Sequence, residues 1–154
     1  MDTRGGTRPS GPLRGAPGHV VRRLHQAYAA AWTRHVDPVL TGPQFAVLMA
    51  ADDFPEIDQG SIAARVALDR STMADVCRRL EDRGLIRRVT APGDGRRKLL
   101  YLTEHGSEVL TTVGERVRRL HEEMLAGDDT NAFLERLNGL VERWDSLAAD
   151  GASA

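Results

Sequence analysis

The chain has 154 residues, of which 41% are hydrophobic and 28% are charged, and its formal net charge is −1. This composition supports a buried core in one domain and excludes a wholly disordered chain. No segment approaches the ~18 consecutive apolar residues that a membrane span requires, and the single cysteine excludes an intrachain disulfide bond. We therefore expect a cytoplasmic protein without a membrane partner.

The first segments are predicted to be a tail and two helices. Residues 1–18 are rich in glycine and proline and lack an apolar period, which predicts a flexible tail before a single domain over 19–154. A helix is predicted over 19–36, because apolar side chains recur at helical spacing and Pro38 follows. A second helix is predicted to begin near Thr41.

A short helix and a longer helix are predicted in the middle of the chain, over 61–66 and 70–83. Asp69 is a good N-cap for the longer helix, and Gly84 follows it where a left-handed C-cap is expected. The order of these two helices, joined by a turn, is typical of a helix-turn-helix unit.

A β-hairpin and two further helices are predicted in the C-terminal half. Two short strands, 85–90 and 98–102, flank a segment dense in turn residues. Thr103 is predicted to cap a fifth helix that runs to about residue 126, and apolar spacing predicts a last helix around 133–147. The fold class is therefore mainly α with a small β-hairpin.

The charges are unevenly distributed over these elements. Residues 61–98 carry ten basic and five acidic side chains, whereas residues 99–154 carry five basic and eleven acidic side chains. A basic segment beside an acidic one indicates a local anion-binding surface, for which nucleic acid is the first candidate. All but one of the 21 basic residues are arginine. Either a GC-rich genome or the suitability of arginine for phosphate and guanine explains this bias.

The helix predicted over 70–83 has an apolar side and a polar side. A helical wheel places Met73, Val76, Cys77 and Leu80 together, so the remaining face offers donors and acceptors suited to bases and phosphates. An amphipathic helix with a solvated charged face shows the same pattern. The basic hairpin favours DNA binding, because Arg87 and Arg88 on its first strand add to three basic residues at its tip and on its second strand. The candidate DNA-contacting residues are Arg70, Ser71, Thr72, Asp75, Arg78 and Arg79 on the helix, and Arg96, Arg97 and Lys98 on the hairpin.

Two sets of motifs lie between Gln59 and Thr103. They are Leu68 to Thr72, Leu80-Glu81 and Arg83-Gly84-Leu85 around the helix, and Asp94, Arg96 and Leu102-Thr103 around the hairpin. With these motifs, residues 18–148 resemble the MarR-type transcriptional regulators. The resemblance implies a winged helix-turn-helix fold, with a DNA-binding part over about 41–102 and dimerisation helices over about 19–36 and 103–148.

The resemblance also implies a partner and a mode of action. The expected partner is a double-stranded DNA operator, bound by a homodimer that reads a pseudo-palindrome with half-sites about one helical turn apart. Repression, with release by a small aromatic acid such as a hydroxybenzoate or a cinnamate, is the implied response, and no cofactor is implied. Arg96 is assigned to the minor groove, where negative potential attracts arginine, and Asp94 is expected to hold it through an ion pair.

The first helix contains the candidate effector-binding residues. In family members that respond to aromatic carboxylates, an arginine near the start of this helix pairs with the ligand, and Arg22 is its equivalent here by resemblance. A guanidinium suits a carboxylate because two parallel donors meet two oxygens. The polar stripe of Arg22, His19 and Gln26 is either a pocket wall or a solvated surface, and Arg23, on its flank, is the alternative ligand holder. Tyr28 and Trp32 are either an aromatic wall or core residues.

Other signals and other functions remain as alternatives. A family member can respond to oxidation, although Cys77 lies on the apolar side of its helix and is expected to be a small buried hydrophobe. It can also respond to a metal, although no tight motif joins the five histidines. A dimeric interaction module without DNA binding is the remaining alternative. An enzyme is not expected, because the sequence has no P-loop and no G-x-G-x-x-G, G-x-S-x-G or H-E-x-x-H motif.

Overall fold

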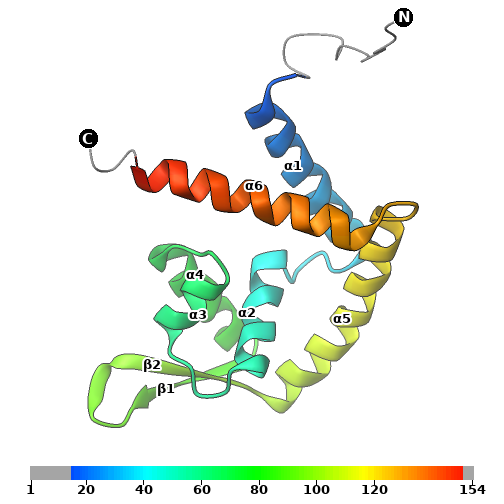
Figure 1. The fold of residues 1–154 in the computed structure, drawn as a ribbon. Coiled ribbons are helices and arrows are strands. Elements are labelled where there is room, and N and C mark those ends of the chain that lie inside the picture. Colours follow the sequence, from blue (N-terminus) through cyan, green and yellow to red (C-terminus); the bar gives the residue numbers. More distant parts are fainter. Residues whose placement is uncertain (1–14, 151–154) are drawn as a thin grey trace, which may run out of the picture. The chain divides into compact units, whose positions relative to one another are not determined.

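The computed structural model describes residues 15–150, which form six helices and one antiparallel β-hairpin (Figure 1). This order confirms the predicted fold class. The elements, in chain order, are α1 (Pro17–His35), α2 (Gly42–Asp53), α3 (Gln59–Arg65), α4 (Arg70–Asp82), β1 (Ile86–Ala91), β2 (Asp94–Leu102), α5 (Glu104–Met124) and α6 (Thr130–Asp150).

Four elements begin earlier than their patterns predicted. Helix α3 begins at Gln59 rather than at residue 61, and α6 begins at Thr130 rather than at about residue 133. Helix α1 begins at Pro17 rather than at residue 19, because proline is well suited to a first helical turn. Most of the predicted tail, residues 1–14, lies outside the described residues. Strand β2 begins at Asp94 rather than at residue 98, because a register shift after Thr90 lets Ala91 pair with Asp94. Some of the residues predicted to form the turn therefore belong to the paired strands.

Capping residues define the starts of α2 and α3 and the end of α4. Thr41 and Gln44 form a capping box at the start of α2. Asp58 caps α3 by accepting from the backbone N–H of Ser61 at 3.0 Å. Gly84 takes a φ of +68° directly after α4, as expected of a left-handed C-cap.

Helices α2, α3 and α4 pack together with the hairpin around one apolar core (Figure 1). The backbone N–H of Leu100 donates to the carbonyl of Ile57 at 3.1 Å, so the segment before α3 pairs with the inner end of β2. The most deeply buried side chains of the core are Leu40, Val47, Leu48, Ile62, Met73, Cys77, Leu80, Leu85, Ile86 and Leu100.

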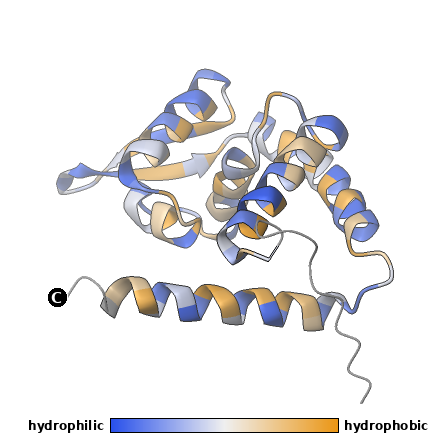
Figure 2. Ribbon diagram, turned by 90° about the horizontal axis from the view of Figure 1, so that it is seen from above, coloured by the Kyte–Doolittle hydropathy of each residue, from blue (hydrophilic) through white to orange (hydrophobic). Residues whose placement is uncertain are grey.

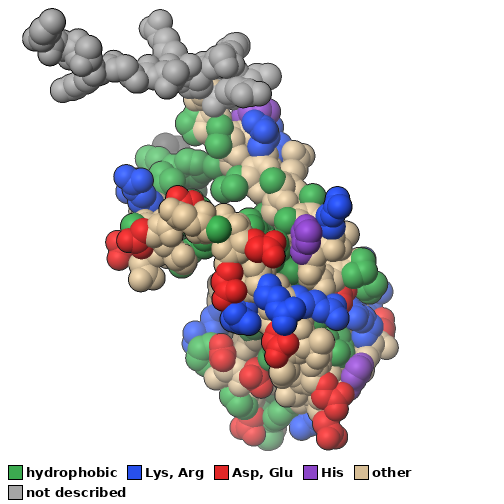
Figure 3. All heavy atoms as spheres, turned by 90° about the vertical axis from the view of Figure 1, so that its right-hand side faces the viewer, with side chains coloured by type: hydrophobic (Ala, Val, Ile, Leu, Met, Phe, Trp, Pro, Cys, Tyr) green, Lys and Arg blue, Asp and Glu red, His purple; other side chains and the backbone are tan. Residues whose placement is uncertain are grey.

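The chain divides into two compact units, Met1–Val117 and Arg118–Ala154. In the first unit, α1 leaves Val20, Val21 and Leu24 about half exposed. In the second unit, hydrophobic residues recur along α6 between hydrophilic ones (Figure 2), and several of them, such as Trp144 at 43% and Leu147 at 70%, are exposed. Hydrophobic side chains are also visible between charged ones on the face shown in Figure 3. Exposed apolar stripes of this kind mark interaction surfaces.

None of the helices in the described part of the chain is both long enough and apolar enough to cross a membrane.

Candidate nucleic-acid interface

The start of α4 is organised by the carboxylate of Asp69. This carboxylate accepts from the backbone N–H of Thr72 at 2.9 Å and from the hydroxyls of Ser71 at 2.8 Å and Thr72 at 2.7 Å. Each hydroxyl donates its hydrogen inward and keeps acceptor lone pairs for other partners. The predicted contact residues Ser71 and Thr72 are thus held in place, exposed, at the helix N-terminus.

This cap makes the stability of the protein depend on pH. The three hydrogen bonds favour the charged form and hold the pKa of Asp69 well below its ordinary value of 3.8. The stabilisation is therefore complete above that ordinary value and is lost as the pH falls through the lowered pKa of the folded state. Urea unfolding between pH 7 and pH 2 should show this loss for the unmodified protein and a smaller loss for Asp69→Asn. Equal losses in the two proteins would contradict the assignment.

The two faces of α4 are those that the helical wheel predicted. Met73, Val76, Cys77 and Leu80 are buried, and every candidate contact residue on the helix is exposed. Arg78 donates to Asp75 at 2.7 Å across one turn of the exposed face, and this ion pair lowers the pKa of Asp75. Because both side chains are about 60% exposed, the pair contributes little stability and leaves Arg78 available to a ligand.

Cys77 is fully buried on the apolar side of α4, as its spacing predicted. Burial raises the pKa of its thiol to about 11, so the reactive thiolate is scarce at neutral pH. We expect iodoacetamide to leave Cys77 unmodified in the folded protein and to label it after unfolding in urea. Rapid labelling under native conditions would return oxidation sensing to consideration.

The basic side chains of the hairpin have different surroundings. Arg88 donates to Glu81 of α4 through Nε at 2.9 Å and also through Nη2, and the guanidinium of Arg87 lies 4.1 Å from the ring centroid of Tyr101. These two arginines hold the hairpin together and against α4, so their charge is explained by packing. The sequence pattern did not separate them from the arginines of the second strand.

The other basic residues of the hairpin include one arginine whose side chain has no partner. Lys98 donates to the hydroxyl of Thr90 at 2.6 Å, and Arg97 lies 3.4 Å from the carboxylate of Asp58. Among the basic residues of the hairpin, all of which lie within the described residues 15–150, Arg96 is the one whose guanidinium has no hydrogen bond, ion pair or ring contact. Its charge is free for an external anion.

Asp94 supports Arg96 in a different way from the one that the resemblance implied. Asp94 accepts from the backbone N–H of Arg96 at 3.0 Å, and the expected ion pair between their side chains is not formed. The short span between the two residues favours this local turn contact over a bond to the distant end of the guanidinium. Asp94 therefore orients the backbone at the tip of the hairpin, which forms the wing of the fold, and leaves the side chain of Arg96 unrestrained.

Sequence reasoning assigned no contact to two acidic residues of this surface. Glu81 joins α4 to β1 through Arg88, and Arg88 lowers the pKa of Glu81. Asp58 joins the start of α3 to Arg97 of β2, across 39 residues of sequence. Neither pair has a recognisable spacing, because both depend on how the hairpin folds back onto the helices.

The candidate effector residues of α1 do not share one environment. Arg22, Arg23 and Gln26 are exposed, whereas His19 and Tyr28 are partly buried. Trp32 is only 4% exposed, donates from Nε1 to the carbonyl of Leu40 at 2.6 Å and lies 5.6 Å from the ring of Phe45. Trp32 is therefore a core residue, while the ring of Tyr28, 6.2 Å from Trp32, lies at the edge of this cluster, where burial raises its pKa.

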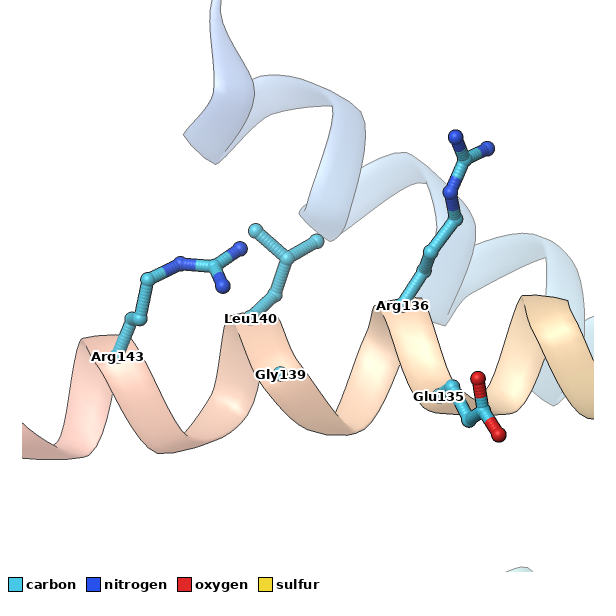
Figure 4. A pocket seen from close by; sticks show the side chains of 5 residues that line it. All are labelled: Glu135, Arg136, Gly139, Leu140 and Arg143. Atoms are coloured by element: carbon cyan, nitrogen blue, oxygen red, sulfur yellow. The ribbon is translucent and has the colours of Figure 1, made fainter.

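A shallow hollow on α6 contains none of these candidates. It is lined by Glu135, Arg136, Gly139, Leu140 and Arg143 (Figure 4). The side chains of Arg136, Leu140 and Arg143 rise from one side of the helix, and Glu135 points elsewhere. Among the described residues there is also no group of three or more histidine, cysteine or acidic side chains suited to a metal ion.

The chain is similar to proteins of known class, and residues 40–98 match the MarR family. Transcriptional regulator HosA of Escherichia coli O111:H- is 34% identical over 132 residues, which cover 84% of this chain and 97% of HosA. The PcaV transcriptional regulator from Streptomyces coelicolor, solved with its natural ligand, is 39% identical with a TM-score of 0.82 over 92% of this chain and 99% of PcaV. The transcriptional repressor CouR, solved on a 23-mer DNA duplex, is 27% identical with a TM-score of 0.73 over 92% of this chain and 98% of CouR.

Proposed function

Because the chain belongs to the MarR family of transcriptional regulators, we propose that it is a homodimeric repressor that a small aromatic carboxylate releases from its operator. The proposed operator is a pseudo-palindrome in double-stranded DNA, and the proposed effector is of the hydroxybenzoate or cinnamate type. Each of these three parts, the DNA, the dimer and the effector, has its own support.

The free guanidinium of Arg96 at the wing is the observation that carries the DNA assignment. A cation without an internal partner favours an external anion, and the narrow minor groove concentrates negative potential. The exposed face of α4 complements it with Arg70, Arg78 and Arg79 for phosphates and base edges. CouR, which shares the fold, was solved bound to a DNA duplex.

The exposed apolar residues of α1 and α6 support the homodimer. Val20, Val21 and Leu24 on α1 are 46–50% exposed, and Trp144 and Leu147 on α6 are exposed in turn. A second copy of the chain that covers both helices removes this apolar surface from water. A two-fold dimer presents two copies of α4 to DNA, which matches a pseudo-palindromic site.

The polar stripe of α1 supports a carboxylate effector. Arg22 is exposed and no ion pair within the described residues involves it, so two parallel donors are available to a carboxylate. Tyr28 lies six residues further along and adds a partly buried aromatic ring to the same helix. PcaV, the relative of 39% identity, was solved with its natural ligand.

Binding of the purified protein to the intergenic DNA upstream of its own gene tests the proposal. Fluorescence anisotropy at fixed salt, with and without a panel of hydroxybenzoates and cinnamates, should show tight binding that one acid abolishes. Tight binding that no acid affects would keep the DNA assignment and contradict the carboxylate effector. If the protein is a dimer but binds neither this DNA nor any duplex in a pool of random sequences, the DNA assignment is contradicted and an interaction module is favoured.

A further inference from the structure

Thr103 lies between the end of β2 and the start of α5 and contacts the segment that leaves α4. Figure 1 shows how β2 leads into α5. Its hydroxyl donates to the carbonyl of Gly84 at 2.6 Å, with the carbonyl of Leu85 at 3.1 Å, and accepts from the backbone N–H of Gly106 at 2.9 Å. Its own backbone N–H donates to Leu85 at 3.1 Å. One side chain thus caps α5 and binds the exit of α4, across 19 residues of sequence.

The two segments that Thr103 joins are in direct contact. A Cβ atom on Gly106 would lie 2.0 Å from the carbonyl oxygen of Leu85, so only glycine allows the first turn of α5 to approach so closely. Leu85 is buried, and its N–H donates to the carbonyl of Leu80 at 2.9 Å, within the last turn of α4. A displacement of the first turn of α5 is therefore transmitted through Leu85 to the end of α4.

We propose that Thr103 is a positioning residue for operator recognition, which fixes the orientation of α4 relative to α5 and so sets the half-site spacing that the protein accepts. This inference rests on the proposed function, because α5 is one of the helices assigned to the dimer. The hydroxyl hydrogen of Thr103 holds α4, and its lone pair caps α5. The two contributions can be separated by substitution.

Aspartate separates them. Thr103→Asp keeps a good cap for α5, because a carboxylate accepts from the N–H of Gly106, but an ionised carboxylate cannot donate to Gly84. Thr103→Val removes both bonds at nearly constant shape, and Thr103→Ser keeps both. Thr111→Val is the matched control, because Thr111 lies on α5 and donates to the carbonyl of Ser107 at 3.0 Å within the same helix.

The test measures binding to the footprinted operator and to versions in which the half-sites are one base pair closer or further apart. The unmodified protein, Thr103→Ser and Thr111→Val should prefer the natural spacing by the same factor. Thr103→Asp and Thr103→Val should lose about tenfold on the natural operator, the equivalent of 1.4 kcal/mol, and much less on the altered ones. Their preference for one spacing should therefore shrink.

Two results would overturn the inference while leaving the proposed function in place. Thr103→Asp with unchanged affinity and preference would contradict it, and so would a loss of equal factor at all spacings, which a merely structural role predicts. If Thr103→Val does not fold, circular dichroism will show this and Thr103→Asp still decides between the outcomes. Failure of the unmodified protein to bind any operator would instead overturn the proposed function, and this inference with it.

Discussion

Arg96→Ala is expected to weaken operator binding about tenfold to a hundredfold, the equivalent of about 1–3 kcal/mol. The Arg96 guanidinium has no partner among the described residues, so no internal contact has to break before it enters a minor groove. For the same reason the substitution should leave folding and the dimer intact. Alanine at this position therefore isolates the contribution of the DNA contact.

Affinity should be measured at several salt concentrations, because a contact with DNA also changes the salt dependence of binding. Arg118→Ala is a matched control, because Arg118 is an exposed arginine that pairs with Glu122 on α5 at 2.6 Å. Arg88→Ala gives a contrast, because it should lower the stability of the hairpin through the loss of the Glu81 contact. Unchanged affinity of Arg96→Ala at all salt concentrations would refute the assignment of Arg96 to the groove.

Arg22→Ala is expected to bind the operator normally and to require at least about tenfold more aromatic acid for release. Hydrogen bonds between charged groups contribute about 1.5–3 kcal/mol, and a guanidinium pairs with a carboxylate through two of them. Arg22 lies on α1, outside the helix and the hairpin that carry the DNA-contact candidates. Operator affinity without the acid should therefore not change.

The measurement is release of labelled operator as a function of the acid that is active on the unmodified protein. Arg23→Ala is the informative comparison, because Arg23 is the adjacent exposed arginine on the same helix. Loss of release in Arg23→Ala alone would transfer the role to Arg23. Release of both variants at the acid concentration that the unmodified protein requires would contradict the carboxylate site on α1.

Much of the local structure could be predicted because its causes are short-range. The apolar period of α4 predicted which four side chains are buried, and Asp69 and Gly84 marked the two ends of that helix. Caps and periods depend on residues within about one turn of each other, so they are visible in a sequence. The boundaries were less exact at α1, α3, α6 and β2. Pro17 and the shifted pairing of Ala91 explain the early starts of α1 and β2.

The candidate site could be predicted only as a set of residue types. The sequence placed five basic residues on the hairpin but did not show that Arg88 binds Glu81 or that Arg97 lies beside Asp58. It also left open whether Trp32 lines a pocket, which the hydrogen bond to Leu40 and the contact with Phe45 decide in favour of the core. These partners are separated by 7 to 39 residues, and no periodicity connects them.

Local sequence patterns were therefore sufficient to predict the order of the helices and the hairpin, the buried face of α4 and the resemblance to a family of regulators. Which charges pair internally and which stay free depends on the folded arrangement. Arg87 and Arg88 are engaged by Tyr101 and Glu81, while the guanidinium of Arg96 has no such contact among the described residues. This difference arises because burial and helical period are encoded in neighbouring residues, whereas the partner of a charge depends on which segments the fold brings within hydrogen-bond distance.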